Sequence, residues 1–212
     1  MNRAMFWTRL VQLVLGVLAT LFVYFPYVRR VHGRLPRGKN LYVCNHVSLL
    51  DTLILGSCLF VRGHSPILVL GDRGTWKQSG LRDLLSRQVG FLIDRGAPDK
   101  AMVDRLREFG SKIDRFELIV FPEGTRGDGR TVGPCQPGIR FIARAADTPI
   151  VPVFLEGVER VTSKHGPRRL LRGLRKIEIH IGEAFSMGDV PRKEFTTEVQ
   201  RRLQMLSPQA RT

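Results

Sequence analysis

The first fifty residues of this chain contain no aspartate or glutamate, and the whole chain of 212 residues contains only three cysteines. Cys44, Cys58 and Cys135 are an odd number, and they lack the paired spacing of a zinc site. This pattern argues against a cysteine-based metal centre. It indicates free thiols in a reducing compartment, where such residues usually pack as small buried hydrophobes.

Acidic side chains are scarce along the whole chain. The 34 Lys and Arg residues stand against 19 Asp and Glu residues, which gives a formal net charge of +15. Such a surface favours polyanions, either nucleic acid or an anionic bilayer, and composition alone leaves both open. The hydrophobic content of 43% is ordinary for a globular protein, and the length predicts one domain with an appended anchor.

An apolar span of 19 residues, Leu10–Val28, stands out near the start of the chain. It is interrupted only by Gln12, Gly16, Thr20 and Pro26. This length is near the minimum that crosses a hydrocarbon core of about 30 Å, and it predicts membrane contact. Whether the span crosses the bilayer or lies within one leaflet is open, because Pro26 can end the helix early.

The charges that flank this span predict its orientation. Two basic residues precede it, Arg3 and Arg9, whereas a cluster follows it: Arg29, Arg30, Arg34, Arg37 and Lys39. The positive-inside rule then places the following domain on the cytoplasmic face of the membrane, in contact with anionic lipids. We therefore expect a membrane-anchoring segment at residues 1–36 and a folded domain at residues 37–212.

The rest of the chain alternates between strand-like and helix-like segments. Short apolar runs predict strands at 40–44, 66–70, 89–93, 116–121, 149–155 and 177–181. Helical spacing predicts helices at 48–60, 76–87, 98–113, 138–146 and 191–206. This alternation predicts an α/β fold with a central, mostly parallel sheet flanked by helices.

His46 and Asp51 are the first candidates for chemistry. Five residues apart on a regular helix, their side chains would point about 140° apart and could not pair. Ser48 is a good N-cap, however, and an irregular turn before the helix could bring the imidazole back to Asp51. The carboxylate would then orient the ring and leave its other nitrogen to act as a general base. Alternatively, Asp51 is only a capping residue and His46 an ordinary surface histidine.

A second motif, Phe121–Arg126, directly follows the most apolar predicted strand. Strand ends are where open α/β sheets bind ligands. Gly124 permits close approach of the backbone, while Thr125 and Arg126 supply donors suited to a phosphate. A plain strand-to-loop turn with a solvated arginine explains the same residues.

Three further segments are less specific taken singly. Gly90–Arg95 reads as a strand that ends in a charged pair, and Ile150–Val153 as a strand that contains a proline. Between Glu159 and Glu178 lie seven Lys and Arg residues and no acid. That basic stretch is either a solvated loop or a second contact with anionic lipid headgroups.

In their order, the motifs resemble the glycerolipid acyltransferase family, which includes the 1-acylglycerol-3-phosphate acyltransferases. In that family an Asn-His-x4-Asp motif and a Phe-Ile-Asp-Arg-like element come first. A Phe-Pro-Glu-Gly-Thr-Arg motif and a Val-Pro-Val-like strand follow. This chain has all four in that order between Asn45 and Val153.

The resemblance implies a general base at His46, oriented by Asp51. It implies that the acceptor's phosphate and glycerol meet Glu123, Gly124, Thr125 and Arg126, with Arg95 assisting. It also implies acyl-CoA or acyl-carrier protein as donor, with no cofactor and no metal. The expected reaction is O-acylation of a lysophospholipid, in particular 1-acylglycerol-3-phosphate to give phosphatidic acid.

One departure concerns the acceptor. Family members that use lysophosphatidic acid often carry a Lys-x-Leu-like element in the region that corresponds to Leu70–Gly90. Here only Arg73 and Lys77 are available to replace it. Acyl transfer to a different lyso-lipid, such as a lyso-aminolipid, is therefore the alternative within the enzyme class.

Two other readings come from different classes. A non-catalytic basic protein that binds a membrane surface or nucleic acid fits the net charge, but no nucleic-acid-binding motif is visible and no nucleic acid is expected as partner. A hydrolase that works through Cys44 beside His46 fails, because neighbouring residues on a strand point to opposite faces.

Overall fold

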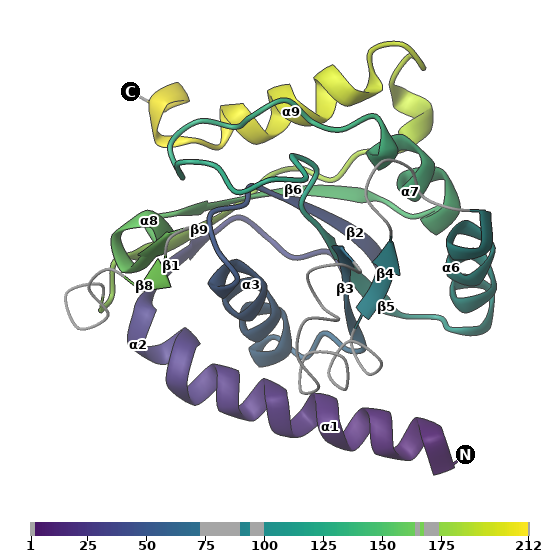
Figure 1. The fold of residues 1–212 in the computed structure, drawn as a ribbon, viewed down its shortest axis with the longest axis horizontal. Helices are drawn as coiled ribbons and strands as arrows, with labels where there is room; N and C mark the ends of the chain where they lie inside the picture. Colours follow the sequence, from purple (N-terminus) through teal and green to yellow (C-terminus); the bar gives the residue numbers. More distant parts are fainter. Residues whose placement is uncertain (1–2, 73–89, 94–99, 164–165, 168–173, 212) are drawn as a thin grey trace.

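The computed structural model describes residues 3–72, 90–93, 100–163, 166–167 and 174–211, and Figure 1 shows their arrangement. A central sheet is covered by helices on both faces. Helix α3 (Leu50–Val61) and the N-terminal helix lie on one side. On the other side lie α6 (Lys100–Lys112), α7 (Gly138–Ala146) and α9 (Phe195–Met205). The predicted α/β fold with flanking helices is confirmed.

The sheet has seven strands in the order β1-β9-β6-β2-β5-β3-β4. Their bounds are Val28–His32 (β1), Lys39–Cys44 (β2), Ile67–Asp72 (β3), Gly90–Ile93 (β4), Phe116–Val120 (β5), Ile150–Glu156 (β6) and Ile177–Ile181 (β9). Neighbouring strands run parallel except β6 and β9, which run antiparallel. The sheet is therefore mostly parallel, as predicted. A separate two-stranded ladder joins β7 (Thr162–Ser163) to β8 (Gly166–Pro167).

Each face of the sheet has its own hydrophobic core. Tyr42 and Ile119 face α3, whereas Leu41 and Leu118 face α7 and α9. Every residue of β5 is buried, because helices cover both of its sides. This explains why the central strands read as continuous apolar runs rather than alternating ones.

The five strands β2 to β6 end at one edge of the sheet, because they all run parallel. We call this the carboxyl edge. Since β9 runs the opposite way, it begins at this edge, where Glu178 pairs with Glu156. β1 runs parallel to β9 and begins there too, with Val28 beside Ile177. The N-terminal helix therefore leads into the carboxyl edge.

The N-terminal helix is continuous from Arg3 to Tyr27: α1 (Arg3–Ala19) passes through a π-helical stretch (Thr20–Tyr24) into α2 (Phe25–Tyr27). By length and composition, Leu10–Tyr27 is apolar and long enough to cross a membrane. One side of it packs on α3, where a Cβ on Gly16 would lie 2.5 Å from the Phe60 ring. The apolar side chains that it leaves exposed are Leu10, Leu13, Val14, Val17, Leu18, Leu21, Phe22 and Phe25.

Strand β1 was not predicted. Its residues fall inside the segment 1–36 that the sequence assigns to the membrane anchor, yet they form an edge strand of the sheet. The division into an anchor and a folded domain stays a prediction, with β1 joining the two. The predicted helix at 76–87 lies outside the described residues. So do four of the seven basic residues between Glu159 and Glu178.

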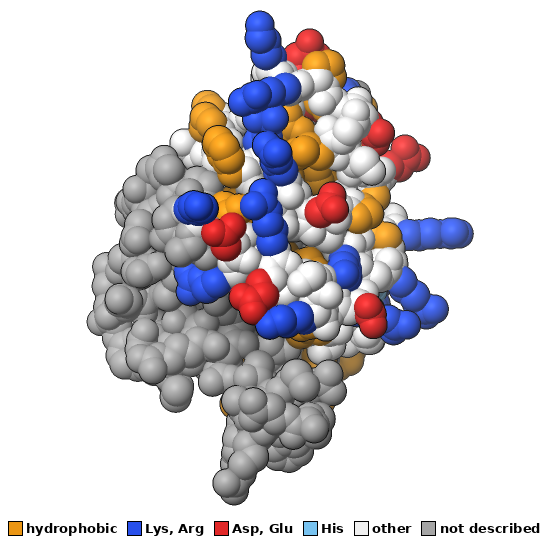
Figure 2. Space-filling view, turned by 90° about the vertical axis from the view of Figure 1, so that its right-hand side faces the viewer, with side chains coloured by type: hydrophobic (Ala, Val, Ile, Leu, Met, Phe, Trp, Pro, Cys, Tyr) orange, Lys and Arg blue, Asp and Glu red, His pale blue; other side chains and the backbone are white. Residues whose placement is uncertain are grey.

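Figure 2 shows the face that carries α6 and α7, where Lys and Arg side chains form a row with acidic side chains beside it. Along α6, Arg107 pairs with Asp104 and Lys112 with Glu108. These pairs are exposed, so each contributes little to stability. Because acids neutralise part of the row, this face is not a surface of one charge.

Candidate active site

His46 and Asp51 meet at the carboxyl edge, just beyond the end of β2. His46 Nδ1 lies 2.8 Å from Asp51 Oδ2. The same oxygen accepts the backbone N–H groups of Val47 at 2.6 Å and Ser48 at 2.8 Å. Asp51 is fully buried, at 0% exposure. Because Oδ2 already accepts two N–H groups, it serves as an acceptor toward Nδ1 as well, so Nδ1 carries the ring proton when the imidazole is neutral.

That tautomer leaves Nε2 as the proton acceptor. No hydrogen-bond partner faces Nε2 among the residues that the structure describes, and the His46 side chain is 16% exposed. The turn that permits this arrangement covers residues 45–49, and α3 is assigned from Leu50 rather than Ser48. Ser48 Oγ accepts the Leu50 N–H at 3.0 Å, so Ser48 still serves the helix start.

Three other contacts fix the position of His46. Glu123 Oε1 accepts its backbone N–H at 3.0 Å, and Gly127 donates its N–H to the His46 carbonyl at 2.6 Å. The Phe121 ring stacks on the imidazole, with ring centroids 4.2 Å apart. The strand-end motif after β5 therefore holds the histidine that follows β2. Sequence spacing could not reveal these contacts.

Asn45 ties the same turn to β6. Its side chain accepts the Leu155 N–H at 2.7 Å and donates to the Leu155 carbonyl at 3.2 Å. The amide thus continues the strand pairing for one residue after β2 has ended. An asparagine directly before the histidine is the sequence signal for this contact, since only its side chain offers both a donor and an acceptor in this geometry.

Glu123 is buried at 4% exposure, and both of its carboxylate oxygens face backbone donors. Oε1 accepts from His46, and Oε2 accepts the Gly133 N–H at 2.9 Å. Burial raises the pKa of Glu123, and the two backbone hydrogen bonds oppose that rise. A Cβ on Gly133 would lie 2.9 Å from Oε2, so this close approach needs glycine. The predicted contact of Glu123 with the acceptor stays a prediction.

The remaining predicted acceptor residues lie next to Glu123. Gly124 has a positive φ of 66°, and both it and Thr125 are exposed. Arg126 is half-buried. These three residues lie between Glu123, whose side chain accepts the His46 N–H, and Gly127, which donates its N–H to the His46 carbonyl. Arg95, Arg73 and Lys77 lie outside the described residues.

Backbone N–H groups near the start of α3 are candidates to stabilise an oxyanion. Most of them are already engaged: His46 with Glu123, Val47 and Ser48 with Asp51, and Leu50 with Ser48 Oγ. The Asp51 N–H bonds to the Ser48 carbonyl. Within the described part of the chain, the Leu49 N–H has no hydrogen-bond acceptor, so it is a candidate donor to an oxyanion.

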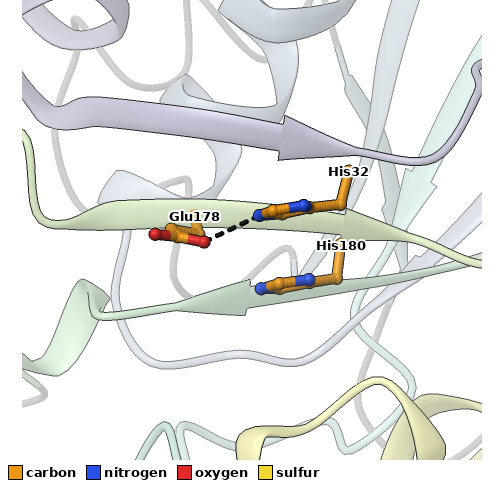
Figure 3. A group of neighbouring side chains, drawn as sticks. All are labelled: His32, Glu178 and His180. Carbon is orange, nitrogen blue, oxygen red and sulfur yellow. Dashed lines mark hydrogen bonds and ion pairs between the residues drawn. The ribbon is translucent and has the colours of Figure 1, made fainter. Parts of the chain in front are cut away.

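His32, Glu178 and His180 form a cluster of possible metal ligands on strands β1 and β9 (Figure 3). Their ligand atoms lie within 4.8 Å of one another. The two rings stack 4.5 Å apart and only 1° from parallel, so one ion cannot lie in both ring planes. His32 instead pairs with Glu178 at 2.7 Å.

The surroundings of His180 also disfavour a cation. Arg211 donates to Nδ1 at 3.1 Å, which leaves Nε2–H to donate to Glu156 at 3.0 Å. Burial, followed by the Arg211 charge, lowers the pKa of His180 and favours this neutral form. The cluster therefore ties the edge strand β1 and the C-terminal residues to the sheet.

The three cysteines are free and buried, as the sequence predicts. Burial raises the pKa of Cys58 to about 11 and that of Cys135 to about 12, and it raises the pKa of Cys44 as well. Thiols of this kind are poor nucleophiles at neutral pH. The three thiols are therefore poor candidates for a nucleophile at the carboxyl edge.

A family model described as Acyltransferase matches residues 28–156, more than half of the 212 residues. The chain belongs to this acyltransferase family. It is an acyltransferase enzyme, and the matched range runs from the start of β1 to the end of β6 and includes the whole turn around His46.

Two relatives are named as lyso-lipid acyltransferases. The acyltransferase is 27% identical over 207 residues to a lyso-ornithine lipid O-acyltransferase of Pseudomonas aeruginosa, covering 89% of this chain and 75% of the relative. It is 28% identical over 167 residues to a 1-acyl-sn-glycerol-3-phosphate acyltransferase of Escherichia coli, covering 77% of this chain. The chain spans 64% of the length of that second relative.

A solved structure shares the fold. The crystal structure of the 1-acyl-sn-glycerophosphate (LPA) acyltransferase PlsC from Thermotoga maritima matches with a TM-score of 0.66. The match covers 98% of this chain and 85% of that one, at 20% sequence identity. The arrangement of this acyltransferase is therefore PlsC-like along nearly its whole length.

Proposed function

We propose that this acyltransferase moves a fatty acyl group from an acyl thioester to the free hydroxyl of a lysophospholipid, with 1-acylglycerol-3-phosphate as acceptor and phosphatidic acid as product. The observation that carries the proposal is the His46–Asp51 pair. Asp51 Oδ2 fixes the ring through Nδ1 and leaves Nε2 to accept a proton, at the edge of the sheet where Gly124–Arg126 also lie.

The reaction is a direct transfer. The acceptor hydroxyl donates to His46 Nε2 and loses its proton as its oxygen attacks the thioester carbonyl. The tetrahedral intermediate then breaks the carbon–sulfur bond, and the thiolate takes the proton from the imidazolium. Asp51 stabilises the imidazolium while it exists. Either acyl-CoA or acyl-carrier protein fits as donor, because both present a thioester.

Acyl transfer to a lyso-ornithine lipid is the second candidate. The lyso-ornithine lipid O-acyltransferase of Pseudomonas aeruginosa aligns over 89% of this chain, against 77% for the glycerophosphate enzyme of Escherichia coli. The two acceptors differ in one chemical respect that the site can sense: one carries a phosphate, whereas ornithine carries an ammonium and a carboxylate. Arg126 suits the phosphate.

A panel of lysolipids, offered with acyl-CoA and with acyl-carrier protein to the purified enzyme, tests the proposal by mass spectrometry of the products. Acylated 1-acylglycerol-3-phosphate supports the first candidate, and acylated lyso-ornithine lipid supports the second. If neither these nor any other lysolipid is acylated with either donor, the proposed function is wrong.

Replacing Arg126 with alanine should raise the KM for 1-acylglycerol-3-phosphate by about 10- to 100-fold and change kcat little. The reason is the loss of charge-assisted hydrogen bonds to the phosphate, which are worth about 1.5–3 kcal/mol. Steady-state kinetics with varied acceptor measures this. Arg130→Ala is the matched control, because Arg130 is an exposed arginine of the same loop. An unchanged KM for Arg126→Ala would remove the phosphate-binding role.

We also propose that the N-terminal helix lies in one leaflet on the cytoplasmic face, rather than across the bilayer. Gly16 packs on Phe60 of α3, Val23 joins the core, and Arg62 donates to the Tyr24 hydroxyl at 3.1 Å. A helix that crosses the bilayer as a single span would have lipid on all sides. Here one side contacts the domain and the other exposes apolar residues, as in a helix that lies in the interface.

Fluorophores attached at Leu10→Cys and Leu21→Cys, which are exposed on the same side of the helix, should report the same shallow depth in vesicles that contain phosphatidylglycerol, measured by quenching with lipids labelled at known depths. The native cysteines are buried, so labelling is selective. A spanning helix would separate the two labels by about 16 Å, from eleven residues at roughly 1.5 Å each. Phe141→Cys, on the opposite side of the sheet and 53% exposed, should remain unquenched.

A further inference from the structure

The loop between β5 and α7 is held by two glutamines of the C-terminal helix α9. Gln204 Oε1 accepts the Val132 N–H at 2.9 Å, and Gln200 Nε2 donates to the Val132 carbonyl at 3.3 Å. The glutamines are four residues apart, so they lie on one side of α9. Both backbone groups of a single loop residue are thus bound by one helix.

The next residue of the loop contacts the site. The Gly133 N–H donates to Glu123 Oε2 at 2.9 Å, and Oε1 of the same carboxylate accepts the His46 N–H at 3.0 Å. The Gly133 N–H therefore fixes one oxygen of the Glu123 carboxylate, and the other oxygen fixes the backbone of His46. A continuous route of hydrogen bonds and backbone runs from α9 through Val132, Gly133 and Glu123 to His46.

We propose that Gln200 and Gln204 are positioning residues for acyl transfer, which hold Val132 so that Glu123 sets the place of His46. The proposal rests on the proposed function of His46 as the base. It assigns a role to the C-terminal helix, which lies outside the range that the family model matches.

The glutamines are not needed to attach α9 to the sheet. That packing comes from Phe195, Val199 and Leu203, which are buried at 0–1% exposure. Gln204 is oriented by its own amide, whose Nε2 donates to Ser207 Oγ at 2.9 Å and so turns Oε1 toward Val132. The two side chains are used with opposite polarity: an acceptor at 204 and a donor at 200.

Substitutions that keep or remove this polarity test the proposal, because a role in packing alone would not depend on whether the side chain donates or accepts. Gln204→Met removes the hydrogen-bond acceptor for the Val132 N–H, and Gln200→Glu removes the donor to the Val132 carbonyl. Each variant should lower kcat about 10-fold and leave the KM for the lysolipid unchanged. Misplacement of a reacting group can cost up to about 100-fold in rate. Gln204→Glu keeps an acceptor and Gln200→Lys keeps a donor, so both should stay within about two-fold of the unsubstituted enzyme.

Matched charge controls are Thr197→Glu and Thr197→Lys, at an exposed position of the same helix, and neither should change kcat. If Gln204→Glu loses as much activity as Gln204→Met, polarity does not matter and the proposal is wrong. The same conclusion follows if Gln204→Met keeps full kcat.

Hydrogen exchange gives a readout that is independent of activity. Peptides that contain Val132 and Gly133 should exchange faster in Gln204→Met than in Gln204→Glu, and unchanged exchange would show that the glutamine does not hold the loop. If the unsubstituted enzyme acylates no lysolipid, the proposed function fails, while the exchange result still decides whether α9 fixes the loop.

Discussion

Replacing His46 with alanine should lower kcat for acyl transfer by about 10²- to 10⁴-fold, the usual contribution of a general base. Alanine removes the imidazole, whose Nε2 takes the proton of the acceptor hydroxyl in the proposed mechanism. The fold should persist, because the His46 contacts with Glu123 and Gly127 are made by its backbone, which alanine retains. Initial rates with saturating donor and acceptor measure the loss.

Two controls separate this effect from a loss of structure. The thermal unfolding midpoint and vesicle binding of His46→Ala should match those of the unsubstituted enzyme. His32→Ala should keep full activity, because His32 is an exposed histidine that pairs with Glu178 away from the site. Full turnover by purified His46→Ala would contradict the proposed mechanism and leave the family assignment in place.

The sequence could predict the sheet because its central strands are buried on both faces and therefore read as apolar runs. The predicted ranges for β9 and α7 coincide with the observed ones. The edge strand β1 escaped prediction for the opposite reason. It has one buried residue, Val28, in a basic segment that directly follows the apolar N-terminal helix, so nothing in its pattern separates it from the predicted anchor.

For the site, the sequence predicted that His46 and Asp51 can pair before the helix, but it did not predict which way the neighbouring side chains turn. The pairing of His46 with Asp51 was foreseeable, because the helix-start pattern at Ser48 allows an irregular turn before it. The orientation of Glu123 was not, since its contacts with His46 and Gly133 come from loops far apart in sequence. The contact of α9 with Val132 is equally non-local.

The fold also contains a buried polar group far from this chemistry. Glu117 on β5 is 2% exposed and bonds to His64 Nδ1 at 2.7 Å and to Asn40 Nδ2 at 3.1 Å. Burial raises the pKa of Glu117, and its hydrogen bonds with His64 and Asn40 oppose that rise. The hydrogen bond from His64 thus replaces part of the hydration that the Glu117 carboxylate loses on burial.

Replacing His64 with leucine should lower the free energy of unfolding at neutral pH by about 3–5 kcal/mol, the usual loss when one partner of a buried pair is removed. Because His64 opposes the rise, the pKa of Glu117 should rise further in the variant. A raised pKa in the folded state means that the contribution of Glu117 to stability is present below its unfolded pKa, about 4.3, and is lost as pH rises above it.

The double variant His64→Leu/Glu117→Gln isolates this contribution, since it differs from His64→Leu only in the carboxylate. Urea unfolding should find the double variant more stable at pH 8, and the difference should shrink as pH falls toward 4.3, where the carboxyl of the single variant is protonated. If both variants show the same pH dependence, Glu117 is not a buried charge that His64 compensates. The loss in His64→Leu would then come from packing around α3 alone.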